Sequence, residues 1–221
     1  MTSETNPTAN RFPATCFGLI RHGETSWNRQ KKIQGQTQTR LTPEGERQVQ
    51  GWATPLKKLP WDRILTSDLI RAQKTAEALN ATLNLPLHCN SKIREQDWGD
   101  WTGRTIRQLR ADQPQAVAAQ ETAGWNFRPP RGESRQEVLG RSREALLETA
   151  RRWPGKKILV VTHNGVLKCL LYHLSQRPFL PDEGPLIRPF HLHWLQATPK
   201  GIALKEINAL ALQPVKSIEK R

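Results

Sequence analysis

Three short apolar segments, each ending in polar residues, most constrain the fold of this chain. They are residues 16–20, 63–66 and 157–162, and each has the length and apolar content of a buried strand. Between and after these segments, apolar residues recur at the three- and four-residue spacing of a helix. Strands that alternate with helices predict a mostly parallel sheet covered on both faces, which is a three-layer α/β/α sandwich.

Helix boundaries can be predicted from local signals. Thr42 and Pro43 fit the N-cap and first position of a helix that buries Val49, Trp52 and Ala53 and weakens at Pro55. Residues 67–68 are expected to cap a second helix. A long helix is predicted over 133–153 and another after residue 162. Further short strands are predicted near 85–89, 192–197 and 202–207.

The length of 221 residues favours one domain, which we place at 13–221. The first 12 residues are polar and are expected to form a disordered tail. The alternation of strand and helix signals is interrupted at about 97–131. This segment contains tryptophans, arginines and prolines and two short helical stretches, 106–110 and 114–120. A segment of this kind is typical of an insertion that shapes a binding site.

Composition narrows the class of protein. The net charge is +14, but the basic residues are dispersed and no nucleic-acid-binding module accompanies them, so nucleic acid is not the expected partner. The chain has no apolar run of 18 residues and no secretory signal, which predicts a cytoplasmic protein without a membrane partner. Cys16, Cys89 and Cys169 are far apart and are expected to be buried structural thiols, not zinc ligands.

Polar residues follow all three apolar strands. Arg21 and His22 follow the first, Ser67 the second and His163 the third, while Arg71 lies one turn into the helix after the second. Because ligands bind beyond the carboxyl ends of parallel strands, these groups are expected to converge. A neutral imidazole is a good nucleophile near pH 7, and arginine suits phosphate oxygens. We therefore hypothesise that His22 attacks phosphorus.

The motifs occur in a fixed order. They are 19–28 (LIRHGETSWN), 34–35 (QG), 41–45 (LTPEG), 67–72 (SDLIRA), 94–99 (REQDWG), 132–134 (GES) and 161–165 (VTHNG). Together they resemble the histidine phosphatase superfamily, also called the phosphoglycerate mutase-like family, from about residue 17 to about 174. The resemblance implies the phosphoglycerate mutase-like fold and a reaction that passes through a phosphohistidine intermediate.

The resemblance also implies residue roles. The catalytic set comprises His22 as nucleophile, Arg21, Arg71 and His163 around the phosphoryl oxygens, and Glu95 as proton donor. Asn28, Gln34, Gly35 and Asn164 match positions of the phosphate or substrate pocket. Glu24 and Asp97 are the alternative carboxylates for the role of proton donor. Gln38, Arg40, Thr102 and Asn164 depart from the usual family pattern and leave substrate identity open. Arg40, Arg104, Arg128 and Arg131 could contact a polyanionic substrate, although exposed positions are the simpler interpretation.

Three functions remain in view. About 38 residues separate Glu95 from Glu133, fewer than the insertion of the mutase branch, which favours a phosphatase of the histidine acid phosphatase type acting on a small phosphorylated metabolite. This activity is expected to need neither metal nor cofactor. The alternatives are a cofactor-dependent phosphoglycerate mutase and a non-catalytic protein that binds phosphorylated ligands. The oligomeric state stays open, a homodimer included.

Overall fold

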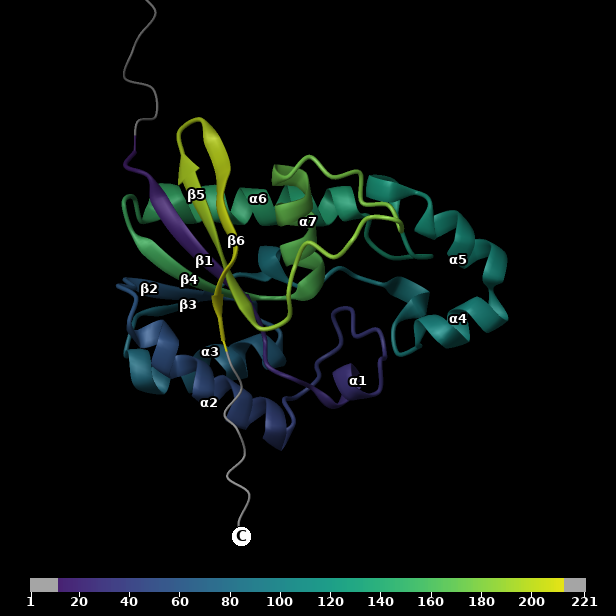
Figure 1. Cartoon of the computed structure of the whole chain (residues 1–221), viewed down its shortest axis with the longest axis horizontal. Helices are drawn as coiled ribbons and strands as arrows, with labels where there is room; N and C mark the ends of the chain where they lie inside the picture. Colours follow the sequence, from purple (N-terminus) through teal and green to yellow (C-terminus); the bar gives the residue numbers. More distant parts are fainter. Residues whose placement is uncertain (1–11, 213–221) are drawn as a thin grey trace, which may run out of the picture.

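A computed structural model describes residues 12–212 as a six-stranded sheet between two layers of helices (Figure 1). The strand order is β3-β2-β4-β1-β5-β6. The parallel strands are β1 (Thr15–Arg21), β2 (Arg63–Thr66), β3 (Leu87–Cys89) and β4 (Lys157–Thr162), and the antiparallel edge consists of β5 (His191–Thr198) and β6 (Gly201–Ala211). The predicted three-layer, mostly parallel α/β fold is confirmed.

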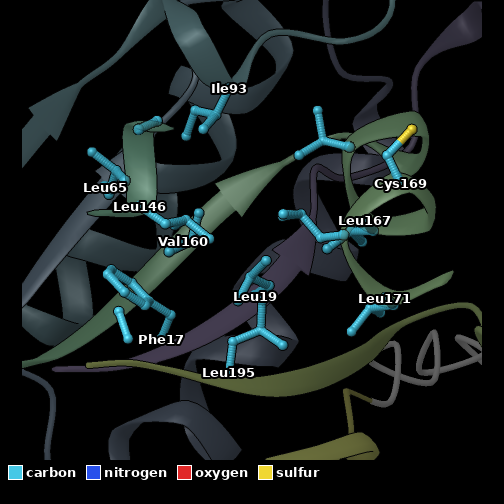
Figure 2. Close-up of a cluster of buried hydrophobic side chains, with 14 of the residues drawn as sticks. Phe17, Leu19, Leu65, Ile93, Leu146, Val160, Leu167, Cys169, Leu171 and Leu195 are labelled. Carbon is cyan, nitrogen blue, oxygen red and sulfur yellow. The ribbon is translucent and has the colours of Figure 1, made fainter. Parts of the chain in front are cut away.

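Successive side chains of the central strands point to opposite faces of the sheet, so the core consists of two clusters. On β4, Ile158 and Val160 face the cluster under α6 (Arg135–Arg152) and α7 (Asn164–Leu174), which Figure 2 shows. Leu159 and Val161 face the cluster under α2 (Pro43–Lys57) and α3 (Ile70–Leu83). Both faces of the strand are therefore apolar, as expected for a sheet covered on both sides.

Two predicted helix features need correction. α2 begins after Thr42, as predicted, but it continues through Pro55 to Lys57. The N-cap of α3 is Leu69, not residues 67–68, and its side chain makes no capping hydrogen bond. Asp68 instead accepts two hydrogen bonds from Arg94, at 2.7 and 2.5 Å. The predicted cap is wrong because the Asp68 carboxylate binds Arg94, in a loop distant in the sequence, and does not cap α3.

The segment predicted as an insertion contains η2 (Gly99–Trp101), α4 (Ile106–Asp112), α5 (Pro114–Glu121) and η3 (Gly124–Asn126). Its buried side chains form a separate small cluster of Trp101, Leu109, Val117 and Phe127. In Figure 1 α4 and α5 lie to one side of the sheet. The short α1 (Ser26–Arg29) and η1 (Ser91–Ile93) complete the helices described.

The N-terminal segment and two of the three cysteines differ from their predicted environments. Eleven residues of the predicted tail lie outside the described range, and Phe12 packs half-buried against the main core. Cys169 is buried as expected, but Cys16 is only partly buried and Cys89 is exposed, so the prediction of three buried thiols is wrong. Cys89 ends a sheet-edge strand, which explains its exposure. Between residues 12 and 212, no helix combines the length and apolarity that a membrane span requires.

Candidate active site

Two neighbouring parallel strands bring the two motif histidines together. β1 and β4 pair in register, and the backbone N–H of His22 donates to the carbonyl of Thr162 at 3.0 Å. The rings of His22 and His163, which follow these strands, lie with centroids 5.2 Å apart. Both side chains are buried. The predicted convergence at the carboxyl ends of the strands is therefore observed for this pair.

The hydrogen bonds of His22 identify its tautomer. Nδ1 lies 2.7 Å from the carbonyl oxygen of Gly23, which can only accept, so Nδ1 carries the proton. Nε2 in turn accepts from Nε of Arg71 at 3.2 Å. Burial, followed by the charges of Arg21 and Arg71, holds the pKa of His22 well below that of a free imidazole. Near neutral pH, Nε2 thus presents an unprotonated lone pair.

Arg71 links this imidazole to the loop that follows α1. Its guanidinium is fully buried and donates to the carbonyls of Gly35 at 2.7 Å and Thr37 at 2.8 Å. Gly35 adopts a φ of +49°, and a Cβ there would lie 2.9 Å from Oγ1 of Thr102. Burial lowers the pKa of Arg71 to about 10, so the group is still a cation at pH 7.

Other buried nitrogens beside His22 have no partner. Within the described part of the chain, neither ring nitrogen of His163 and not Nε of Arg21 forms a hydrogen bond. Burial and the adjacent cations hold the pKa of His163 well below the usual range, so its ring is neutral near pH 7. Unsatisfied buried donors are costly unless a ligand satisfies them. These atoms suit the oxygens of a bound anion.

Glu95 lies against the beginning of α7. Its Oε1 accepts from the backbone N–H of Gln96 at 2.9 Å and from that of Gly165 at 3.0 Å. Gly165 is the second residue of the helix, and a helix N-terminus stabilises a negative group. The carboxyl is therefore fixed in place by main-chain donors.

An ion pair between α6 and the preceding loop supports Glu95. Arg141 donates to both carboxylate oxygens of Glu133, at 2.6 and 2.8 Å, and to the carbonyls of Lys92, Arg94 and Glu95. Both side chains of the pair are mostly buried. This contact positions the loop that carries Glu95. The sequence motifs did not identify Arg141 as a site residue. Its only sequence signal is its place on α6, two turns after Glu133.

A cavity of about 250 Å³ joins these groups. Eight of the nine predicted site residues line it, namely Arg21, His22, Asn28, Gln34, Gly35, Arg71, Glu95 and Asn164. His163 packs beside His22 and does not itself line the cavity. Glu95 is the one carboxylate among the described lining residues. Over residues 12–212, no three His, Cys, Asp or Glu side chains are grouped to hold a metal ion.

The alternative carboxylates have structural partners. Glu24 accepts from Nε of Arg29 at 2.6 Å and from Oγ1 of Thr42 at 2.9 Å, so it holds the motif loop to the start of α2. Asp97 accepts from the backbone N–H of Gly99 at 2.9 Å. Neither side chain lines the cavity. Their positions favour Glu95 as the acid.

Asn28 and Gln34 use their amide oxygens within the loop. Oδ1 of Asn28 accepts from the backbone N–H of Thr25, and Oε1 of Gln34 accepts from Oγ1 of Thr25, both at 3.0 Å. Oε1 of Gln34 also accepts from Oγ1 of Thr39. With the oxygens engaged, the amide nitrogens of both side chains are available to donate to a ligand.

The rim arginines fit the simpler interpretation, because Arg40, Arg128 and Arg131 are exposed and Arg104 is only partly buried. Arg104, Arg128 and Arg131 pair with carboxylates and, like Arg40, do not line the cavity. Gln38 accepts from the backbone N–H of Ile70 at 2.9 Å and so supports α3. The additional cations of the cavity wall are instead Lys32, Arg135 and Lys168, which motif analysis did not identify. Burial raises the pKa of Cys169, also in the wall, to about 12, so its thiol stays protonated.

Replacing Gly165 with alanine is expected to displace the Glu95 carboxyl while leaving the fold intact. An added Cβ would lie 2.2 Å from Oε1 of Glu95, so this carboxylate would have to leave its main-chain donors, and Gly165 has no positive φ. If Glu95 protonates the leaving oxygen, kcat/KM on an alkyl phosphate should fall by about 10²–10³-fold. Hydrolysis of p-nitrophenyl phosphate, whose leaving group needs little protonation, should change much less.

Gly140 provides the matched control. It lies in α6, and a Cβ there would meet nothing within 4 Å. Gly140→Ala should raise the free energy of unfolding by roughly 0.5–1 kcal/mol and leave both activities unchanged. Equal losses on both substrates in Gly165→Ala would contradict the assignment of Glu95.

Comparisons with known proteins show what this chain is similar to. The family model of the histidine phosphatase superfamily (branch 1) matches residues 17–210. The Bacillus subtilis protein named "Uncharacterized phosphatase PhoE" is 34% identical over 161 residues, which are 73% of this chain and 78% of that protein. The Cronobacter sakazakii protein named "Probable phosphoglycerate mutase GpmB" is 36% identical over 162 residues, covering 69% and 71%. The solved structure of a mycobacterial glucosyl-3-phosphoglycerate phosphatase superposes with a TM-score of 0.76 at 31% identity, covering 89% of this chain and 100% of that chain.

Proposed function

Because the chain belongs to branch 1 of the histidine phosphatase superfamily, we propose that it hydrolyses a small phosphomonoester through a phosphohistidine on His22. The observation that carries this proposal is the contact of Nε2 of His22 with Nε of the buried Arg71 at 3.2 Å, in which Nε2 can only accept. A lone pair held next to a fixed guanidinium can attack phosphorus while the charge of the phosphoryl group is neutralised.

In the first step, the lone pair on Nε2 forms a bond to phosphorus and the bond from phosphorus to the ester oxygen breaks. Glu95 gives its proton to that oxygen, which leaves as an alcohol. The phosphoryl group takes over the lone pair that Arg71 contacts at 3.2 Å, and the Arg71 N–H then donates to a phosphoryl oxygen. Nε of Arg21 and the ring of His163, which have no hydrogen-bond partner among residues 12–212, supply further donors.

In the second step, the Glu95 carboxylate takes a proton from water as the water oxygen attacks phosphorus. The bond from phosphorus to Nε2 breaks, the lone pair returns to His22 and inorganic phosphate leaves. One carboxyl serves as acid and then as base. The two guanidinium groups provide the charge neutralisation that phosphoryl transfer requires.

A panel of small phosphomonoesters tests this function through the release of inorganic phosphate, with and without EDTA. We expect phosphate from at least one substrate at a rate that EDTA does not change. Folded protein that releases no phosphate from any ester would contradict the proposal. So would activity that is lost in EDTA and restored by a divalent metal.

A mutase is the second candidate, because a relative at 36% identity is named "Probable phosphoglycerate mutase GpmB". A mutase must bind its substrate in two orientations. Incubation with 3-phosphoglycerate and a trace of 2,3-bisphosphoglycerate separates the two functions. Hydrolysis gives inorganic phosphate, whereas isomer without phosphate would indicate the mutase.

A further inference from the structure

Two connections at the end of the sheet opposite the active site are strongly basic. Residues 57–63 join α2 to β2 and residues 151–157 join α6 to β4, and β2 and β4 are neighbouring parallel strands that begin here. These two segments, which we call the basic end, lie away from α4 and α5 in Figure 1. They contain one carboxylate, Asp62, and seven cations, namely Lys57, Lys58, Arg63, Arg151, Arg152, Lys156 and Lys157.

Hydrogen bonds hold the two connections side by side. The backbone N–H of Asp62 donates to the carbonyl of Lys157, and the Asp62 carboxylate accepts from the backbone N–H of Lys157, both at 2.8 Å. Nζ of Lys156 pairs with Asp62 at 3.0 Å, which is the one ion pair of the basic end among residues 12–212. The cations are dispersed along the chain, but the fold brings them together and leaves six of them without a carboxylate in the described structure.

Trp153 fixes two of these cations in place. The guanidinium carbons of Arg63 and Arg152 lie 4.4 and 4.7 Å from the centroid of its ring. Nε of Arg63 is buried and has no hydrogen-bond partner among residues 12–212. Burial, followed by the charges of Arg152 and Arg63, lowers the pKa of His88, whose ring meets Trp153 edge-on at 5.3 Å. Two cations held at one ring repel each other, so an anion that binds both relieves this repulsion.

The surroundings of Trp153 indicate which anion fits. The ring packs against the core under α6 and α7 and carries two guanidinium groups, so it is not an open platform for stacking a base. Of residues 12–212, the large apolar side chains that are exposed are Leu87, Leu180 and Phe190, and none belongs to the basic end. Insertion into a membrane surface is therefore not favoured.

A duplex matches these properties. It keeps its bases stacked inside and presents one negative charge per roughly 1.7 Å of its axis, which is dense enough to engage several cations at once. Forked guanidinium groups match phosphate oxygens, and lysines add point charges. Contacts of this kind fix a protein on the backbone without reading the sequence.

We propose that the basic end binds the phosphate backbone of a nucleic-acid duplex without sequence preference. The site is separate from the active site, because β4 runs from Lys157 at the basic end to Thr162 beside His163, a distance of roughly 20 Å. A bound duplex therefore leaves the cavity at His22 open. The inference goes beyond the proposed hydrolysis and does not depend on it.

Fluorescence anisotropy of a short labelled DNA duplex of mixed sequence, titrated with the full chain at several salt concentrations, tests the proposal. We expect a Kd of about 10⁻⁴–10⁻⁶ M near physiological salt and tighter binding at lower salt. The triple variant Arg151→Gln, Arg152→Gln, Lys157→Gln removes three exposed cations of the basic end. It should weaken binding by about tenfold or more at low salt and reduce the slope of log K against log salt by about 1 for each cation.

The triple variant Arg107→Gln, Arg188→Gln, Lys205→Gln is the matched control, since it removes the same charge from exposed positions outside the basic end. It should change Kd by less than about twofold and leave the salt slope unchanged. Both variants should release phosphate from esters at the wild-type rate.

Four results would overturn the inference. They are no binding by the wild type, equal weakening in both variants, equal affinity for polyglutamate, and inhibition of ester hydrolysis by the duplex. The second would show attraction by the net charge alone, the third an acidic protein as the fitting partner, and the fourth binding in the active-site cavity. Duplex binding by a protein that releases no phosphate would contradict the proposed function and leave this inference standing.

Discussion

Replacing His22 with asparagine is expected to lower phosphatase kcat/KM by on the order of 10⁵-fold or more. An asparagine amide can still donate to the Gly23 carbonyl that Nδ1 contacts at 2.7 Å, but it has no atom at the position of Nε2. The substitution therefore removes the nucleophile and retains the local hydrogen bond. Steady-state phosphate release, with thermal unfolding as a check on folding, measures the effect.

Binding of phosphate separates loss of the nucleophile from loss of the site. His22→Asn should still bind inorganic phosphate, because Arg21, Arg71 and His163 stay in place. A folded variant with activity within about tenfold of wild type would show that another group attacks phosphorus.

Replacing Arg71 with methionine is expected to lower kcat/KM by about 10³-fold or more. The guanidinium contacts Nε2 of His22 and two loop carbonyls, those of Gly35 and Thr37, so the variant loses both a cation at the reacting atom and the support of the loop. Leaving the buried carbonyls without donors should also lower the free energy of unfolding by roughly 1–3 kcal/mol. Phosphate-release kinetics and urea unfolding measure the two effects separately.

Two further variants test whether the effect of Arg71→Met is specific to the guanidinium group at this site. Arg71→Lys keeps the charge but loses the forked donors, and its activity should lie between those of wild type and Arg71→Met. Arg47→Met removes an exposed arginine that pairs with Glu44 on α2, and it should change activity and stability little. A loss of less than tenfold in Arg71→Met would remove this arginine from the phosphoryl site.

The layers of the fold could be predicted because its central strands are almost wholly apolar. The predicted segment 157–162 has the same limits as β4, and its two faces enter the two cores. The convergence of His22 and His163 also followed from sequence, since both lie directly after parallel strands. Here local pattern and topology were sufficient.

Contacts between distant segments could not be predicted in this way. Asp68 has the residue type and position of a helix cap, yet it pairs with Arg94, and this pairing depends on tertiary structure. Lys168 lies among leucines and valines in the sequence of α7, and only the position of this helix beside the cavity distinguishes it. The support of Glu95 by Arg141 likewise depends on packing of α6 against the loop that carries Glu95.

Direct trapping of the covalent intermediate tests the central claim most closely. The enzyme would be mixed with p-nitrophenyl phosphate and quenched within milliseconds into alkaline denaturant, which preserves phosphohistidine, and its peptides would be mapped by mass spectrometry. The account predicts one phosphoryl group on Nε2 of His22, and none in His22→Asn. Turnover of the ester with no phosphorylated peptide, or with the phosphoryl group on another residue, would contradict it.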